Sequence, residues 1–101
     1  MKVTVCKHPL EITHYQEVGL PGTSVSLLCV GMEQGSGLML WFESYDNGTK
    51  GTQPKKKAQV YVVPTGYSGT DIIGAAYVGT AMDFSGTVLH VYVFGAAVRR
   101  Y

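Results

Sequence analysis

The chain has 101 residues, of which 46% are hydrophobic and 15% are charged, and its formal net charge at pH 7 is +1. This length gives one domain, since it is too short for two independent cores, and the composition excludes a disordered chain. The small net charge excludes a general attraction to duplex nucleic acid or to anionic membranes.

Glycine and proline residues divide the chain at short intervals, which is typical of antiparallel strands and not of helices. The first predicted strand covers Lys2–His8, and Pro9 interrupts it, as suits an edge strand or a bulge. A second strand with one solvent-exposed face is predicted over Leu10–Val18, followed by a turn over Gly19–Thr23.

The strongest strand pair covers Ser24–Met32 and Leu38–Tyr45, and a glycine-containing hairpin connection joins the two strands antiparallel. Alternation divides the second strand into two faces, one with Leu38, Leu40 and Phe42, the other with Met39, Trp41, Glu43 and Tyr45. Trp41 is expected to be largely buried, provided that its indole N–H finds an acceptor.

The next segment, Asp46–Lys57, is polar and is predicted to be an exposed loop, with its basic part at residues 51–57. A strand follows over Ala58–Val63, and then a turn rich in glycine, serine and threonine over Pro64–Asp71. The segment Ile72–Thr80 is ambiguous between a short helix and a strand, because its residues are small. We favour a strand, because the segment contains a Tyr-Val pair.

The longest apolar run lies between Gly86 and Gly95 and favours a strand buried on both faces, since it is rich in β-branched and aromatic residues. Alternation places Leu89, Val91 and Val93 on one face, and Val88, His90, Tyr92 and Phe94 on the other. Residues 96–101 are predicted to be a C-terminal tail. The sequence therefore predicts an all-β, or β-dominated α+β, single domain over residues 1–101, with six or seven mostly antiparallel strands in a barrel-like or sandwich arrangement.

The two cysteines, Cys6 and Cys29, lie on separate predicted strands. A disulfide between them would close a loop of about twenty residues and stabilise the fold by roughly 3 kcal/mol. However, the sequence shows no signal-peptide pattern and no apolar stretch of the roughly 18 residues that a membrane helix needs. We therefore expect a cytoplasmic protein in which both thiols are reduced.

The turn from Pro64 to Thr70 (PTGYSGT) is the best polar candidate for a binding site. In this interpretation its backbone N–H groups and its threonine and serine hydroxyls form a small anion-binding nest, and its tyrosine offers a stacking face. The alternative is an ordinary turn, which is the commoner meaning of such a composition. The predicted ligand contacts in this turn are Thr65, Gly66, Tyr67 and Ser68.

Five of the eight basic residues form two short clusters, Lys55–Lys57 and Arg99–Arg100. If the loop and the tail meet, or if a partner subunit brings them together, Lys57, Arg99 and Arg100 form an anion site. The alternatives are solubilising surface charge, and lysines that protect the edge of the following strand from aggregation.

His90 is the single histidine of an otherwise apolar strand. Such a histidine is usually neutral and hydrogen-bonded within a core or an interface. If it faces a pocket instead, it would donate a hydrogen bond to a phosphate or to the edge of a base, and we include it among the predicted ligand contacts.

Neither a catalytic site nor a metal site is predicted. The candidate metal ligands are Cys6, His8, His14, Cys29 and His90. Their spacing does not match that of a zinc ribbon or a zinc finger. The chain also lacks a G-x-S-x-G elbow, and its acidic residues lie mostly in predicted turns, so that no triad or carboxylate pair converges. We therefore expect no enzymatic activity and no cofactor.

Four motifs follow one another in the chain: LPGTSVSLLCVGMEQGSGLMLWF, VVPTG, YVGT and GTVLHVYVF. In this order they resemble a family of short proteins that bacteriophages and prophages carry and that is recorded as a domain of unknown function. The resemblance spans roughly Val3 to Phe94. The chain departs from the family pattern at Pro64–Tyr67, where the family has a Gly-Thr-Gly-His type of turn, and in the extension Ala96–Tyr101.

The resemblance implies a phage setting and, by analogy with small oligomeric phage proteins, a counter-defence protein that binds without turnover. We expect it to act in the host cytoplasm as a dimeric or tetrameric sponge that sequesters a cyclic (di)nucleotide immune signal. The aromatic rings that would stack on bases are those of Tyr67, Trp41, Tyr45 and Tyr101. The phosphates would be held by the Thr65–Ser68 turn, Lys57 and the two arginines. The alternatives are an anti-CRISPR-like inhibitor of a host defence protein, and a structural or accessory phage component. No membrane partner is expected.

Overall fold

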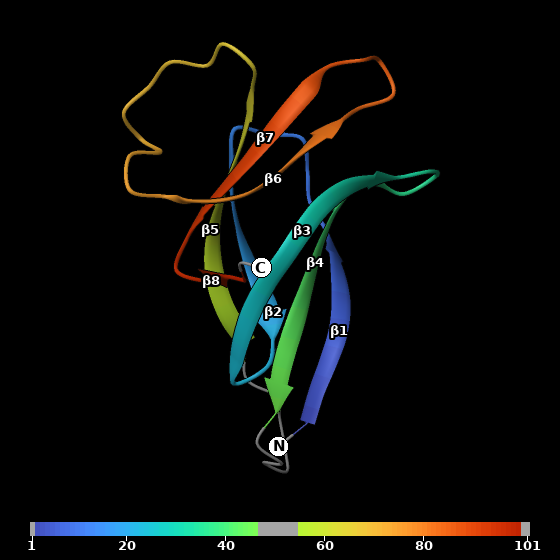
Figure 1. Ribbon diagram of the computed structural model, residues 1–101, viewed down its shortest axis with the longest axis vertical. Helices are drawn as coiled ribbons and strands as arrows, with labels where there is room; N and C mark the ends of the chain where they lie inside the picture. Colours follow the sequence, from blue (N-terminus) through green and yellow to red (C-terminus); the bar gives the residue numbers. More distant parts are fainter. Residues whose placement is uncertain (1, 47–54, 100–101) are drawn as a thin grey trace.

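Residues 2–46 and 55–99 are described by a computed structural model, in which they form eight strands in two four-stranded sheets (Figure 1). The first sheet consists, in spatial order, of β1 (Lys2–Pro9), β4 (Gly37–Asp46), β3 (Ser24–Glu33) and β8 (Ala97–Val98). The second consists of β2 (Tyr15–Pro21), β5 (Lys55–Pro64), β7 (Val88–Phe94) and β6 (Ala76–Met82). All neighbouring strands pair antiparallel except β3 and β8. The predicted all-β fold is confirmed, and no helix in the described ranges is long and apolar enough to cross a membrane.

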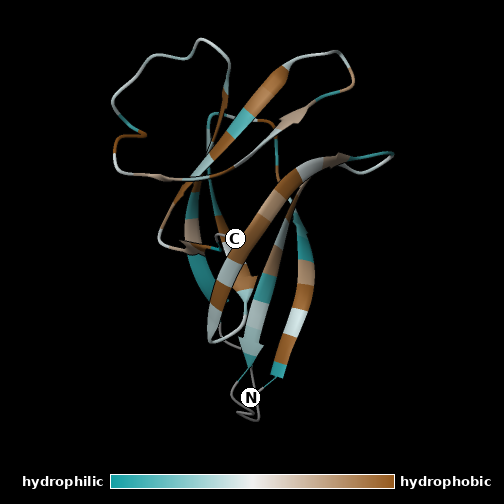
Figure 2. Cartoon of the chain, in the orientation of Figure 1, coloured by the Kyte–Doolittle hydropathy of each residue, from teal (hydrophilic) through white to brown (hydrophobic). Residues whose placement is uncertain are grey.

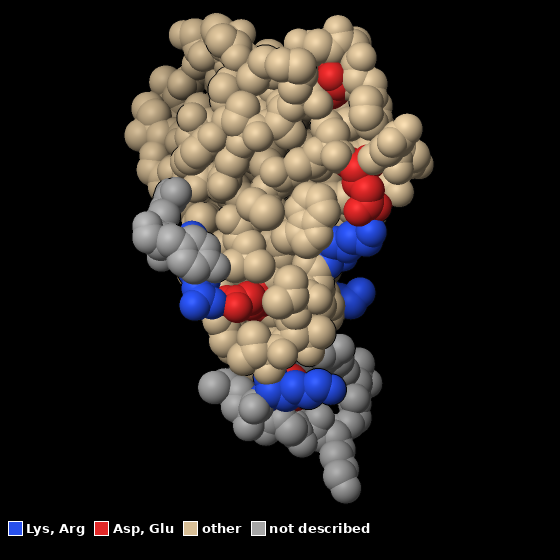
Figure 3. Space-filling model, turned by 45° about the vertical axis from the view of Figure 1, so that its right-hand side comes forward, with Lys and Arg blue, Asp and Glu red and all other residues tan. Residues whose placement is uncertain are grey.

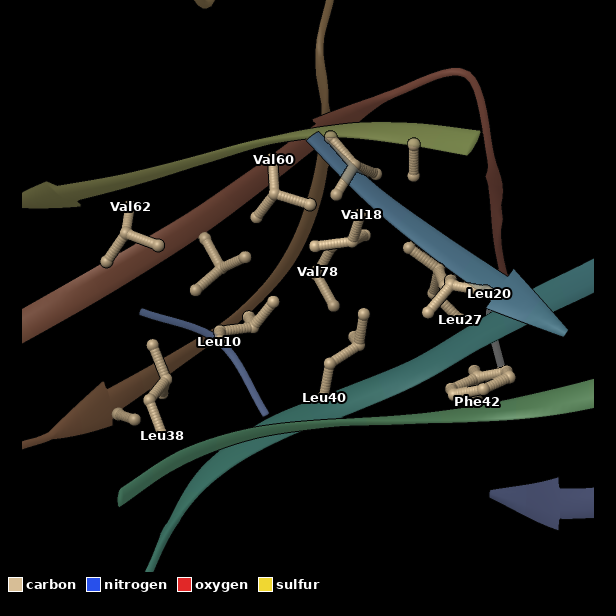
Figure 4. Close-up of a cluster of buried hydrophobic side chains, with 14 of the residues drawn as sticks. Leu10, Val18, Leu20, Leu27, Leu38, Leu40, Phe42, Val60, Val62 and Val78 are labelled. Carbon is tan, nitrogen blue, oxygen red and sulfur yellow. The ribbon is translucent and has the colours of Figure 1, made fainter. Parts of the chain in front are cut away.

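The two sheets pack face to face around one hydrophobic core. Alternation along each strand produces this core, because every second side chain points between the sheets. Figure 2 shows the alternation of hydropathy along β7, and Figure 4 shows the apolar side chains that meet in the core. The largest fully buried side chains are Phe42, Leu20, Leu27, Leu38, Leu40, Val60, Val91 and Val93.

The sandwich is closed along one side and open along the other. On the closed side β3 packs against β6, and Gly79 permits the close approach, since a Cβ at this position would lie 3.0 Å from Val30 Cγ2. On the open side a groove of about 600 Å³ runs between β1 and β2, and its lining includes His8, Glu11 and Glu17. On the closed side β3 and β6 cover each other, whereas on the open side the groove separates β1 from β2.

Five predicted strands are confirmed, and each observed end lies within three residues of the predicted one. They are the strands predicted over Lys2–His8, Ser24–Met32, Leu38–Tyr45 and Ala58–Val63, and the one between Gly86 and Gly95. The predicted faces of the last strand are confirmed as well, because its odd-numbered residues enter the core. The prediction that both faces of this strand are buried is wrong, since the even-numbered residues are only half-buried. The described residues contain eight strands and not six or seven, because β8 was not predicted.

The predicted strand over Leu10–Val18 is wrong in its first part, because β2 begins only at Tyr15. The Leu10 N–H donates to the Leu38 carbonyl at 2.9 Å, and its side chain enters the core, so the chain crosses here from the first sheet to the second. At its other end β2 continues through Pro21 into the predicted turn, because its pairing with β5 extends that far.

Three boundaries in the second half also differ from the prediction. Lys55–Lys57 open β5 and pair with the end of β2, whereas a loop was predicted there; residues 47–54 lie outside the described ranges. Within Ile72–Thr80 the strand covers only the second part, after two turns. Ala97–Val98 pair with β3 as β8 and are not part of a free tail. Pairing with distant strands orders these stretches, and a local pattern does not reveal such pairing.

Candidate functional site

The connection between β5 and β6, residues 65–75, is a long loop (Figure 1). It is held to the second sheet by a contact between Asp71 and His14, and together with β7 it lines a cleft. This cleft, which we call the Thr65 cleft, has a volume of about 200 Å³. It is lined by Val63, Pro64, Thr65, Gly66, Tyr67, Ile72, His90 and Tyr92. Apolar and aromatic walls with a few convergent polar groups are the usual character of a small-molecule site.

Two glycines allow the loop to bend closely around this cleft. Gly66 has a φ of +91°, a left-handed conformation that glycine adopts without steric cost, and the following Tyr67 N–H donates to the Pro64 carbonyl at 3.1 Å. At Gly69 a Cβ would lie 2.2 Å from the Tyr67 hydroxyl oxygen, so any side chain there would displace the tyrosine. The glycines of the PTGYSGT segment therefore position one wall of the cleft.

His90 is fixed in the floor of the cleft by two threonine hydroxyls. Its Nε2 lies 2.7 Å from Thr65 Oγ1, and its Nδ1 lies 2.9 Å from Thr80 Oγ1, which in turn hydrogen-bonds to the Tyr77 hydroxyl. A hydroxyl both donates and accepts, so both ring nitrogens are satisfied in either neutral tautomer. The contact with His90 also orients the Thr65 hydroxyl, which keeps a further lone pair for a ligand.

A second polar cluster, formed by His14, Tyr67 and Asp71, holds the loop against the sheet, and we call it the Asp71 latch. His14 Nε2 lies 2.6 Å from Asp71 Oδ2, and the Tyr67 hydroxyl donates to Asp71 Oδ1. The rings of His14 and Tyr67 are in contact, with centroids 5.1 Å apart. The hydrogen bond from Tyr67, together with the one from His14, lowers the pKa of the Asp71 carboxyl, and the hydrogen bond to Asp71 raises the pKa of the Tyr67 hydroxyl.

We expect Asp71→Asn to lower the thermal midpoint of unfolding at pH 7, with the loss disappearing in acid. The pKa of Asp71 is lower in the folded chain than in the unfolded one, so its stabilising contribution is complete above the ordinary value of about 4 and is lost as the pH falls through the folded-state pKa. Thermal unfolding followed by circular dichroism from pH 7 to strong acid measures this. A difference between the two proteins that did not change with pH would contradict the latch.

Four tyrosines form a row across the outer face of the second sheet, beside the cleft. Each strand contributes one of them, and the strand register places Tyr15 opposite Tyr61, Tyr61 opposite Tyr92, and Tyr92 opposite Tyr77. The ring centroids of Tyr15 and Tyr61 are 5.0 Å apart, and those of Tyr77 and Tyr92 are 5.5 Å apart. Because Tyr92 also lines the Thr65 cleft, the aromatic row continues into it.

The structure brings together four of the predicted contact residues, Thr65, Gly66, Tyr67 and His90, all of which line the cleft. Ser68 lies in the same loop but is not among the lining residues. Trp41 is half-buried on the outer face of the first sheet, where it lies between Lys7 and Cys29 in the register. The hydrophobic core therefore separates Trp41 from the cleft.

The predicted cationic contacts do not reach the cleft. Lys57 lies six residues before Val63 on β5, which is about 20 Å along a strand, and its ammonium is 3.7 Å from Glu17. The Arg99 guanidinium pairs with Glu43 of the first sheet, and Arg100 lies outside the described residues. On the face shown in Figure 3, basic side chains gather away from the end that carries the β5–β6 loop. Within residues 2–46 and 55–99, no lysine or arginine lines the cleft.

Sequence reasoning missed Tyr92, Thr80, Ile72 and the Asp71 latch. Alternation along β7 already groups Tyr92 with His90, so this signal was present in the sequence. Thr80 joins the site through the pairing of β6 with β7, where it lies opposite His90. His14 and Asp71 are 57 residues apart in the chain and meet only because the loop folds back.

The candidate metal ligands of the sequence do not converge. Cys6 is half-buried and packs against the core, whereas Cys29 is exposed on a strand on the other side of β4, and both thiols are free. Within residues 2–46 and 55–99 no three side chains of histidine, cysteine, aspartate or glutamate are grouped closely enough to hold a metal ion.

One known family matches almost the whole chain. A family model described as Domain of unknown function (DUF7352) matches residues 1–99 and so includes every described strand, the Thr65 cleft and the Asp71 latch. Comparison with the curated proteins and with the solved structures found no match. The resemblance to a family recorded as a domain of unknown function is therefore confirmed: this chain belongs to the DUF7352 family.

Proposed function

We propose that the protein is a binding protein that takes up a nucleotide-type ligand in the Thr65 cleft and sequesters it without turnover. The observation that carries this proposal is the combination, in one cleft, of an oriented His90–Thr65 pair with the aromatic faces of Tyr67 and Tyr92. Aromatic faces stack on any base, and fixed hydroxyl and imidazole groups hydrogen-bond to the polar edge of a base.

The size of the cleft limits how much of the ligand it encloses. Its volume of about 200 Å³ lies below the range of about 300–1,000 Å³ that is typical of pockets enclosing a drug-sized ligand. One base therefore enters the cleft, and the rest of the ligand lies outside it, along the row of tyrosines. A cyclic dinucleotide would use two such clefts, which favours a sponge made of two or more copies.

The charges around the cleft indicate which part of the ligand is recognised. Among the described residues no lysine or arginine lines it, and the carboxylate of Asp71, in the same loop, is engaged with His14 and Tyr67. Phosphate recognition normally relies on cations or on several free N–H groups. The base is therefore the main recognition element in this proposal, and the phosphates remain in water at the mouth of the cleft.

The biological setting in this proposal is that of a phage counter-defence protein that removes a cyclic-nucleotide immune signal. Its support is the ordered set of motifs in the sequence, which resembles a phage-borne family. A protein that removes a signal by holding it needs a cleft, and the Thr65 cleft provides one.

Isothermal titration calorimetry with cyclic dinucleotides, cyclic trinucleotides, mononucleotides and nucleosides tests this function. We expect one base type to bind with a dissociation constant tighter than about 10 μM, roughly −7 kcal/mol, and the corresponding nucleoside to displace it. Mass spectrometry of the ligand released by denaturing the protein should recover it intact. The proposal fails if no member of the panel gives heat at this affinity, and a hydrolysed ligand would indicate an enzyme instead.

A further inference from the structure

The four edges of the two sheets are not equally protected against pairing with another strand. The β8 edge is only two residues long, and β6 has an irregularity in its register between Tyr77 and Gly79 and packs against β3. At the β2 edge the Gln16 side chain forms two hydrogen bonds with the backbone of Glu11, at 2.7 and 3.0 Å. Short strands, bulges and edge coverage are the usual means by which proteins prevent edge-to-edge association.

In the part of the chain that the structure describes, the β1 edge is neither short nor bulged, and its protective residue types lie at its two ends, where Lys2 is the first residue and Pro9 the last. Its eight residues pair with β4 in one unbroken register, so half of its backbone N–H and C=O groups point away from the sheet. Val3 and Val5 are 49% and 65% exposed on its outer face. The ammonium of Lys7, the residue type that most often protects an edge, reaches across β4 to Glu33 at 2.7 Å and so turns away from the free edge.

We propose that the β1 edge pairs antiparallel with the β1 edge of a second copy, so that the two first sheets join into one continuous eight-stranded sheet. The partner offers the same row of unpaired backbone groups, as a two-fold symmetric interface requires. This proposal does not depend on the ligand of the Thr65 cleft, which lies on the other sheet.

The charges near the two ends of β1 favour the antiparallel arrangement. Lys2 begins the strand, whereas His8 and Glu11 line the groove at its other end. The groove is also lined by Lys55 and by Glu17, whose carboxylate lies 3.7 Å from the Lys57 ammonium. Lys2 and His8 lie on the same face of β1, because even-numbered residues share a face. An antiparallel pair brings Lys2 of each copy to the groove end of the other, near its Glu11 carboxylate, whereas a parallel pair would place the two Lys2 ammonium groups together.

The two-fold symmetry provides a sharp test. With Lys2 of one copy opposite His8 of the other, the axis passes at residue 5, because residues 2 and 8 are equally far from it, so residue 5 of one copy lies near residue 5 of the other. We expect the unaltered protein to sediment as a dimer at micromolar concentration, and Val5→Lys and Val5→Glu each to sediment as monomers, since like charges then face each other. An equimolar mixture of the two variants should form a dimer again. Ile73→Lys, a matched change at a 73% exposed residue of the β5–β6 loop, should leave the dimer intact.

Three results would overturn this interface. The first is an unaltered protein that is monomeric, which would leave the edge free for a strand of a different protein. The second is a Val5→Lys variant that is still dimeric. The third is a mixture of Val5→Lys and Val5→Glu that stays monomeric. Circular dichroism shows whether each variant is folded, and the exposure of Val5 gives the substitutions no core contact to lose.

Discussion

Phe42→Ala is expected to lower the free energy of unfolding by about 3–5 kcal/mol. The Phe42 side chain is 1% exposed and lies in the core between the sheets, close to Leu27 and Leu20 in Figure 4. Removing the ring takes away its transfer free energy and leaves a cavity that packed strands on both sides cannot close. Urea unfolding followed by circular dichroism measures the loss as a shift of the midpoint with an unchanged slope.

Phe84→Ala is the matched control, because the same atoms are removed at a residue that is 72% exposed in the β6–β7 connection. We expect this variant to differ from the unaltered protein by no more than about 0.5 kcal/mol. Domains of this kind have total free energies of unfolding of about 5–15 kcal/mol, so the loss in Phe42→Ala is a large share of the total. If Phe42→Ala does not fold, Phe42→Leu takes its place, because this substitution removes less volume and costs less free energy. Equal effects of the two alanine substitutions would contradict the position of the core.

The core of the sandwich was predictable because it depends on a local signal. Alternation in the second strand of the Ser24–Tyr45 hairpin places Leu38, Leu40 and Phe42 on one face, and this face is the one that the second sheet covers. A glycine-containing connection then fixes the antiparallel pairing. Both signals lie within about twenty residues of one another, so that neither needs knowledge of the tertiary arrangement.

The candidate site was only partly predictable, because it depends on pairing between strands far apart in the chain. The PTGYSGT turn and His90 were singled out from their composition, and they do lie in one cleft. The row of tyrosines depends on the registers of three strand pairs, and a shift of one residue in any of them would move a ring to the opposite face. No local pattern contains that information.

The predicted lysine contact was wrong, because the run of lysines that is obvious in the sequence does not lie at the Thr65 cleft. The sequence predicts the three consecutive lysines in an exposed loop, with an anion site as one possibility if this loop meets the C-terminal arginines. In the structure they open β5, and Lys55 lines the groove between β1 and β2. Adjacent residues in a strand alternate between its two faces, so a run of lysines in β5 cannot converge on one ligand. Charge clustering in the sequence is therefore weaker evidence for a site than the pairing of the strand that contains it.

His90→Ala is expected to weaken binding of the base-containing ligand by about 10- to 100-fold, since the loss of one oriented hydrogen-bonding group corresponds to about 1.5–3 kcal/mol. His90 lines the Thr65 cleft and also orients the Thr65 hydroxyl at 2.7 Å, so its removal changes two polar contacts at once. Thr65→Val removes only the hydroxyl at nearly constant size and should give a smaller loss. Calorimetric titration of each variant with the ligand identified from the nucleotide panel measures both effects.

His8→Ala is the matched control for this experiment, because His8 is also half-buried on a strand but lies on β1, where its ring hydrogen-bonds to the Pro9 carbonyl at 2.7 Å. Its affinity for the ligand should equal that of the unaltered protein. The double variant His90→Ala/Thr65→Val should bind no more weakly than His90→Ala alone, because the histidine is what makes the hydroxyl effective; additive losses would show that the two groups act separately. Unchanged affinity in His90→Ala would place the ligand outside the Thr65 cleft, even if the protein binds a nucleotide elsewhere.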